Sequence, residues 1–214
     1  EIASCLVGSE MCIRDRDNKT VNDNPNDAKA ISLGTQVYDT VATELEQRWY
    51  AFSVAKATKF TAAMVMDDTA DFDLYVYKLN ETDGTLELVG GSAIVGAGTQ
   101  ELSMLKLDEG IYFIGIEAAT GNGSLLMYTY AGVNDGKEIN DTTDLASSYV
   151  RNSRMTATID SPFDYDYYKV VISKNDILEY TFDQPTGCDY KVLVYDGKNY
   201  YTINNGCLLY TSPS

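Results

Sequence analysis

Hydrophobic and polar residues alternate with a period of two along most of the first 132 residues, in short runs that turn residues interrupt. Such alternation is typical of antiparallel strands with one buried face. No segment of this stretch keeps a helical period for three turns. We therefore predict an all-β fold, an antiparallel eight-stranded β-sandwich or jelly roll. The predicted strands are about 35–42, 48–54, 58–66, 72–79, 85–89, 99–106, 111–118 and 124–131.

The alternation also assigns side chains to the two faces of each strand. One set is predicted to point into the core: Tyr50, Phe52, Val54, Leu74, Val76, Tyr112, Ile114 and Ile116. A second set of aromatic residues then points outward: Trp49, Tyr75, Tyr77 and Phe113. Outward aromatics bury much area at a low entropic cost, so these four are candidates for a surface that binds peptide or sugar. The alternative is that a loop or a neighbouring module covers them.

The pattern repeats at an offset of 118 residues. Asn22-Asp23 returns as Asn140-Asp141, and Trp49-Tyr50 returns as Tyr167-Tyr168. Self-similarity of this kind indicates repeated modules. We expect a complete first copy over residues 17–132, a linker over 133–137 and a truncated second copy over 138–206. Because half a sandwich leaves an apolar face uncovered, residues 139–206 are not expected to fold alone.

Both ends of the chain resemble translated sequencing adaptor. One DNA sequence can encode Cys207 to Ser214 on one strand and Ser9 to Asp15 on the opposite strand. We therefore expect residues 1–16 and 207–214 to be adaptor from a metagenomic fragment and exclude them from the fold. Cys188 is then the remaining cysteine, so the sequence supports no disulfide framework.

The chain is strongly acidic, with a formal net charge of −16 and no histidine. This charge argues against binding to nucleic acid or to anionic membranes, and no apolar run approaches the 18 residues that would predict membrane insertion. The lack of histidine removes Ser-His and Cys-His nucleophiles and His-ligated zinc. We expect no catalysis within this chain.

The order of motifs resembles one bacterial family. The chain opens on Asn22-Asp23, and each copy has an Asp-bearing turn that leads into a Tyr-bearing strand, Asp71 to Tyr77 and Asp189 to Tyr195. In the second copy Asp164 and Asp166 precede Tyr167-Tyr168. This order is similar to that of the pre-peptidase C-terminal (PPC) domain, including the collagen-binding modules of clostridial collagenases. The resemblance implies a non-catalytic β-sandwich, often in tandem, that follows the catalytic domain of a secreted peptidase.

The resemblance also implies calcium at the start of the domain in some members. In the second copy the matching residues are Glu138, Asn140, Asp141, Asp164 and Asp166. In the first copy Asn22, Asp23 and Glu46 match more weakly, because Arg48 stands where the second copy has Asp166. A guanidinium donates hydrogen bonds where a cation needs acceptors. The alternative is that these Asn and Asp residues cap turns through their own backbone, with no cofactor.

Asp67, Asp68, Asp71 and Asp73 form a second acidic run, which we interpret as a solvated turn before a strand. The leading functional hypothesis is an accessory module of a secreted or cell-surface bacterial hydrolase, most simply a peptidase. It would space, stabilise or hold the enzyme on an extracellular protein such as collagen. The alternative is a carbohydrate-binding or surface-adhesion module that acts on polysaccharide.

Overall fold

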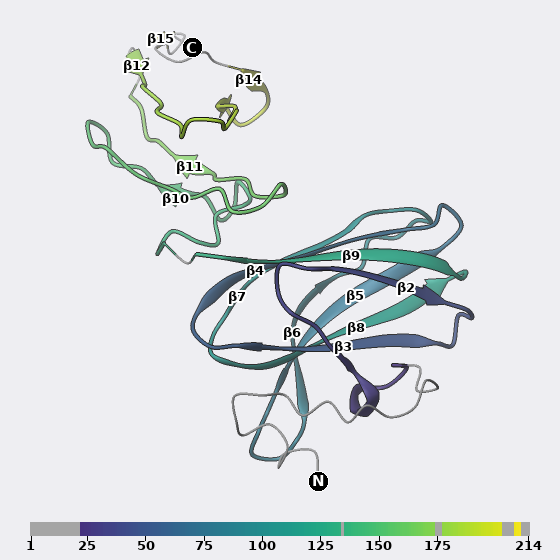
Figure 1. Cartoon of the computed structure of the whole chain (residues 1–214). Helices are drawn as coiled ribbons and strands as arrows, with labels where there is room; N and C mark the ends of the chain where they lie inside the picture. Colours follow the sequence, from purple (N-terminus) through teal and green to yellow (C-terminus); the bar gives the residue numbers. More distant parts are fainter. Residues whose placement is uncertain (1–21, 134, 174–176, 203–207, 211–214) are drawn as a thin grey trace. The chain divides into compact units, whose positions relative to one another are not determined.

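The computed structural model describes residues 22–133, 135–173, 177–202 and, for the backbone alone, 208–210 (Figure 1). Residues 1–16, 207 and 211–214, which the sequence assigns to adaptor, lie outside the described residues, as do 17–21 and 203–206. The chain forms two compact units. The first comprises Glu1–Ser147 and Ser153–Tyr168, and the second Ser148–Asn152 and Lys169–Ser214.

The first unit contains two β-sheets packed face to face (Figure 1). One sheet has the strand order β1-β3-β8-β5-β6, formed by β1 (Lys29–Ala30), β3 (Gln47–Val54), β8 (Gly110–Thr120), β5 (Asp71–Leu79) and β6 (Leu86–Ser92). The other has the order β2-β9-β4-β7, formed by β2 (Gln36–Val41), β9 (Gly123–Gly132), β4 (Thr58–Met66) and β7 (Glu101–Leu107). The prediction of an all-β sandwich is confirmed.

Each of the eight predicted strands overlaps one of the strands β2 to β9. The sequence did not predict β1, because its two residues stand in a polar, turn-rich segment without alternation. β1 is held by the backbone: it pairs in parallel with β3, with Lys29 opposite Tyr50 and Ala30 opposite Ala51. The next residue continues the pairing, since Ile31 N–H donates to the Ala51 carbonyl at 2.9 Å. The other strand pairs of the two sheets are antiparallel.

The core lies between the two sheets, and all eight side chains that were predicted to point inward belong to it. Phe52 is central to its aromatic part: the ring of Phe60 stacks on it from the opposite sheet at 5.0 Å, and that of Tyr112 from its own sheet at 5.6 Å. Stacked rings of this kind add to the stabilisation that comes from burying their area. The contact fixes how the sheets face each other and therefore where their outer faces lie.

The described residues beyond Gly132, where the sequence predicts a second copy, contain short strands: β10 (Ser147–Ser148), β11 (Tyr168–Lys169), β12 (Ile177–Glu179), β13 (Leu193–Tyr195) and β14 (Tyr200–Thr202). β10 pairs with β11 and β13 with β14. β12 pairs with β15 (Leu208–Tyr210), whose residues the sequence assigned to adaptor. Within the described parts of the chain, no helix has the length and apolarity needed to cross a membrane.

Candidate functional site

The Asn-Asp motif at the start of the first copy ties the chain to strand β3. The Asn22 side chain donates from Nδ2 to the Trp49 carbonyl at 2.9 Å, and Trp49 N–H donates back to the Asn22 carbonyl at 2.7 Å. Asn22 is buried, so both bonds lie away from water. Downstream, the Asn24 side chain caps the short 3₁₀-helix η2 (Pro25–Asp27) by accepting from the backbone N–H groups of Asn26 and Asp27. The motif is thus a backbone clamp.

The same bonds recur at an offset of 118 residues. Asn140 Nδ2 donates to the Tyr167 carbonyl at 3.3 Å, and Tyr167 N–H donates to the Asn140 carbonyl at 2.8 Å. The turn before the aromatic pair also recurs. In the first copy Glu46 N–H donates to the Thr43 carbonyl, and in the second Asp164 N–H donates to the Ser161 carbonyl. We call the starts of the two copies, residues 22–50 and 138–168, the first and second openings. The two openings share these hydrogen bonds of the backbone and of the Asn side chain.

The first opening contains its own cation. The Arg48 guanidinium is buried and pairs with Glu46 at 2.8 Å and with Asp39 at 3.3 Å. It also donates to the carbonyl groups of Gln47 and Thr40. These contacts occupy Glu46, one of the weaker calcium candidates. Asn22 donates to Trp49 as described, and Asp23 accepts from the Asn24 side chain at 3.0 Å. The side chains of Asn22, Asp23 and Glu46 are thus engaged in contacts within the protein and do not present a set of free oxygens that would fit a metal ion.

The carboxylates of the second opening pair with a lysine that belongs to the first copy. The ammonium of Lys59, near the start of β4, contacts Asp164 at 2.7 Å, Asp141 at 3.0 Å and Glu138 at 3.2 Å. The Lys59 side chain is only 1% exposed, and all three carboxylates are buried. We call this group, together with the half-buried Asp160 and Asp166, the Lys59 cluster. It belongs entirely to the first compact unit.

The Lys59 cluster holds five carboxylates and one ammonium, and the pKa values reflect this imbalance. Burial opposes the charge on Lys59, but hydrogen bonds to Asp164 and Asp141 outweigh it and raise the Lys59 pKa. Burial raises the pKa of Glu138, Asp141 and Asp166. Burial and repulsion by Asp164 raise the pKa of Asp160 to about 6. One lysine does not neutralise the cluster.

Several oxygens of this region are buried without a hydrogen-bond partner: Asn140 Oδ1, Asp141 Oδ2, both carboxylate oxygens of Asp160, Asp166 Oδ1 and Tyr168 Oη. One oxygen each from Glu138, Asp164 and Asp166 lies within 4.8 Å of the others, a spacing that suits one metal ion. Unpartnered buried carboxylates are costly, and calcium takes oxygen ligands of this type. All five sequence candidates of the second copy lie in one region, and three of them, Glu138, Asp164 and Asp166, have oxygens close enough together to share one metal ion.

The outward aromatic set is less exposed than its alternation suggested. Trp49 packs against Tyr77 with ring centroids 5.3 Å apart, and it lies over Gly115. Trp49 and Phe113 are only 6% and 8% exposed, whereas Tyr75 and Tyr77 are half-buried. None of the four belongs to the core cluster, so they form a separate aromatic layer on the outer face of the β3-β8-β5 sheet. The accessible part of this layer is centred on Tyr75 and Tyr77.

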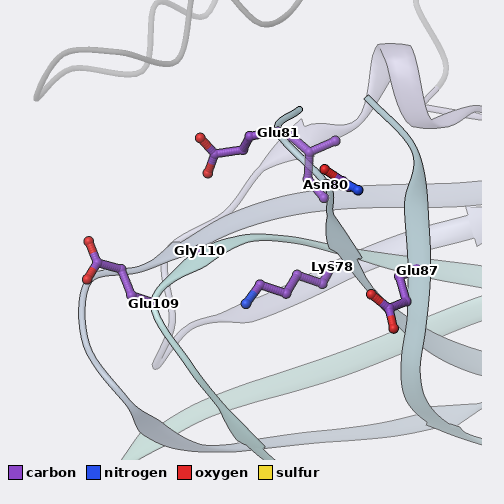
Figure 2. Close-up of a pocket in the computed structure, with 7 residues that line it drawn as sticks. Lys78, Asn80, Glu81, Glu87, Glu109 and Gly110 are labelled. Atoms are coloured by element: carbon purple, nitrogen blue, oxygen red, sulfur yellow. The ribbon is translucent and has the colours of Figure 1, made fainter. Parts of the chain in front are cut away.

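The structure also has an open hollow of about 350 Å³ between β5, β6 and the turn before β8 (Figure 2). Lys78 extends across it toward Gly110, and the acidic side chains of Glu81, Glu87 and Glu109 stand around it. The Lys78 ammonium lies 5.7 Å from the centre of the Tyr112 ring. The lining contains neither a Ser, Thr or Cys nucleophile nor a histidine. The hollow is a polar surface feature and offers no catalytic constellation.

Sequence reasoning missed two members of the Lys59 cluster, Lys59 itself and Asp160. Lys59 interrupts a strand of buried residues between Thr58 and Phe60, which is a signal that its charge has a partner. Its partners, Asp141 and Asp164, lie more than 80 positions further along the chain. The sequence around Lys59 therefore does not identify them.

Comparison with known proteins finds similarity among solved structures and none in sequence. No protein-family model matches the chain, and no curated protein matches its sequence. Among solved structures, the chain is similar to the pre-peptidase C-terminal domain of collagenase from Bacillus anthracis. The TM-score is 0.42 at 16% identity, over 50% of this chain and 99% of that domain. The match names the family that the motif order resembles.

Replacement of Lys59 tests whether its charge holds the second opening to the first sandwich. In Lys59→Met the carboxylates lose their buried cation, so we expect the free energy of unfolding at pH 7 to fall by about 3–5 kcal/mol. Lys106→Met is the matched control, because Lys106 lies opposite Lys59 on β7 and is exposed; its effect should stay within about 0.5 kcal/mol. Urea denaturation followed by circular dichroism measures both. Equal stability of the two variants would contradict the role of Lys59.

The raised pKa of Asp160 predicts a pH dependence. Because the folded state holds this proton up to about pH 6 and the unfolded chain releases it near 3.8, the folded state binds more protons in that interval. Stability should therefore fall as the pH rises from about 4 to 6. Asp160→Asn should remove part of this fall, and Asp144→Asn, an exposed change of the same charge, should not. The test is to measure the melting temperatures of the wild type and the two variants between pH 3.5 and 7.5 in chelator. If the melting temperature depends on pH in the same way in all three proteins, the prediction is wrong.

Proposed function

We propose that this chain is a non-catalytic accessory module of a secreted bacterial hydrolase, most simply a peptidase. The recurrence of the Asn clamp in both openings carries the proposal. It gives a structural reason for the motif order that resembles the PPC domain: Asn22 and Asn140 each fasten the start of a copy to its aromatic strand. The motif thus builds a repeated module and brings no reactive group. The charge and the lack of histidine agree with a role outside catalysis.

The work of such a module is to space, stabilise or hold the enzyme on an extracellular protein substrate of the collagen type. The aromatic layer around Tyr75 and Tyr77 is the surface that supports a holding role, because both tyrosines are half-buried and keep part of their surface accessible to a ligand. The same layer also supports the alternative, a carbohydrate-binding or surface-adhesion module, since sugars stack on exposed rings. The catalytic domain is expected elsewhere in the parent protein.

The second opening is also proposed to bind calcium. Glu138, Asp164 and Asp166 supply converging oxygens, while Asn140 and Asp141 each have a further unpartnered oxygen in the same region. Lys59 neutralises part of the charge through Glu138, Asp141 and Asp164, and Asp166 has no ion pair with it among the described residues. A metal ion would therefore neutralise the charge of Asp166, which Lys59 does not pair with. Asp166 stands at the position that corresponds to Arg48 of the first copy.

Retention on insoluble substrates tests the holding role. The full chain should sediment with fibrillar collagen, and Tyr75→Ser should weaken its apparent affinity about tenfold, as expected for an aromatic contact residue. Tyr38→Ser is the control, because Tyr38 is exposed on β2 in the other sheet. Sedimentation with cellulose or chitin in place of collagen would favour the alternative. Hydrolysis of a peptide or glycoside substrate by the purified chain would overturn the non-catalytic proposal.

Calcium at the second opening is tested by melting the full chain in calcium and in chelator. Calcium at a hundred times its dissociation constant should stabilise the fold by about 2.7 kcal/mol, which raises the melting temperature by several degrees. Asp166→Asn should reduce that rise, whereas Asp144→Asn, an exposed control, should preserve it. The same rise in Asp166→Asn and in the wild type would place the calcium elsewhere.

A further inference from the structure

A second group of carboxylates lies at one edge of the sandwich, away from the Lys59 cluster. Asp71 and Asp73 stand at the start of β5, and Glu101 is the first residue of β7. One oxygen of each lies within 4.8 Å of the others. β5 and β7 belong to different sheets, so this group, which we call the strand-start cluster, spans both layers of the sandwich. The sequence had grouped Asp71 and Asp73 with Asp67 and Asp68 in a solvated turn.

The structure corrects that interpretation. Asp67 and Asp68 are exposed, and Asp67 accepts from Ser124 N–H at 2.7 Å, which is the behaviour of a turn residue. Asp71 is 6% exposed, and Glu101 has no exposed surface. The ladder between β5 and β8 shifts register between Asp71 and Phe72, and irregularities of this kind re-aim the side chains beside them.

The loop of residues 93–100 between β6 and β7 holds the two buried carboxylates by one oxygen each. Ile94 N–H donates to Glu101 Oε1, and Gly96 N–H donates to Asp71 Oδ2, both at 3.0 Å. The second oxygens, Asp71 Oδ1 and Glu101 Oε2, are buried without a hydrogen-bond partner. The loop therefore holds both side chains in place, and one carboxylate oxygen of each lies close to one oxygen of Asp73.

The negative charge of this cluster is not balanced by a cation of the described chain. Two carboxylates buried so close together repel each other, and an uncompensated buried charge is costly. Lys59 balances part of the other cluster, but among the described residues no Lys or Arg pairs with Asp71, Asp73 or Glu101. Asp73 is half-buried and accepts from the Tyr75 hydroxyl at 3.0 Å, so one side of the cluster is open toward the surface. A cation can reach it from there.

We propose that Asp71, Asp73 and Glu101 bind a calcium ion beneath the loop of residues 93–100. The donors are all oxygens, which selects a hard cation over zinc or copper. Calcium tolerates the irregular geometry of three carboxylates from two strands and completes its six to eight ligands with water, whereas magnesium demands a near-ideal octahedron. Bound there, the ion ties together the loop, β5 and β7. The site is independent of the calcium proposed for the second opening and of the accessory role.

The test is calcium binding by the full chain and its Glu101→Gln variant, measured by equilibrium dialysis and by isothermal titration. Glu101→Gln keeps the shape and the acceptor for Ile94 but removes one charge. Glu87→Gln is the matched control, since Glu87 is exposed on β6. We expect Glu101→Gln to lose one bound calcium, or to weaken that site at least about tenfold, and Glu87→Gln to retain it. Asp166→Asn should retain it as well, which separates this site from the Lys59 cluster.

Two further measurements guard against a folding defect. In chelator Glu101→Gln should melt at or above the wild-type temperature, because it relieves the repulsion with Asp71, and in calcium it should melt below the wild type. If the variant does not fold, Asp73→Asn decides, because Asp73 is half-buried and its loss leaves the core intact. With Asp166→Asn in the background to remove the other proposed site, terbium should luminesce through Tyr75, and much less when Asp73→Asn is added. Unchanged calcium stoichiometry and affinity in both variants, or no calcium bound by the wild type, would overturn the proposal.

Discussion

Buried negative charge must be neutralised, and the ammonium of Lys59 does this where the second copy begins. It lies on β4 of the first sandwich and is surrounded by carboxylates that come from beyond the linker, Asp141 and Asp164 nearest of all. Because the ammonium and these carboxylates are shut off from water, the pairing is sensitive to loss of either partner. The opening of the second copy therefore depends on a residue of the first copy.

Comparison of the two openings shows how the same backbone accommodates different charges. The Asn clamp and the turn before the aromatic pair are alike in both. In the first copy Glu46 pairs with Arg48, its neighbour but one. In the second copy Asp164 occupies the place of Glu46, but Asp166 stands where Arg48 stood, so the local cation has become another anion. Lys59 is the substitute, and it reaches only part of the enlarged carboxylate group. The local fold persists because its hydrogen bonds run through the backbone and the Asn amides, which the change of charge does not touch.

The strands and the inward faces could be predicted from the sequence because alternation is a local property. Phe52 and Ile114 lie in the core for the reason that their positions in the pattern indicate. The charged clusters could be predicted only in part. The resemblance to the PPC domain marked Asp164 and Asp166 as candidate ligands, but Lys59 and Glu101 are brought in by tertiary pairing of distant strands, which has no local signal. The burial of Trp49 was also beyond reach, since alternation gives the side of the sheet and not what packs on that side.

The composition of the whole chain bears on how the charge of both buried clusters is balanced. The chain has 32 Asp and Glu residues against 16 Lys and Arg residues, so at most half of its carboxylates can pair with a cation of their own. Exposed carboxylates need no partner because water screens them, and the shortage therefore falls on those that the fold buries. Arg48 and Lys59 pair with carboxylates of the two openings, whereas within the described part of the chain no Lys or Arg pairs with Asp71 or Glu101 of the strand-start cluster. Protons and metal ions are two ways to supply the charge that such buried acids lack. Because the strand-start cluster has converging oxygens and an open side, a metal ion is the better fit there.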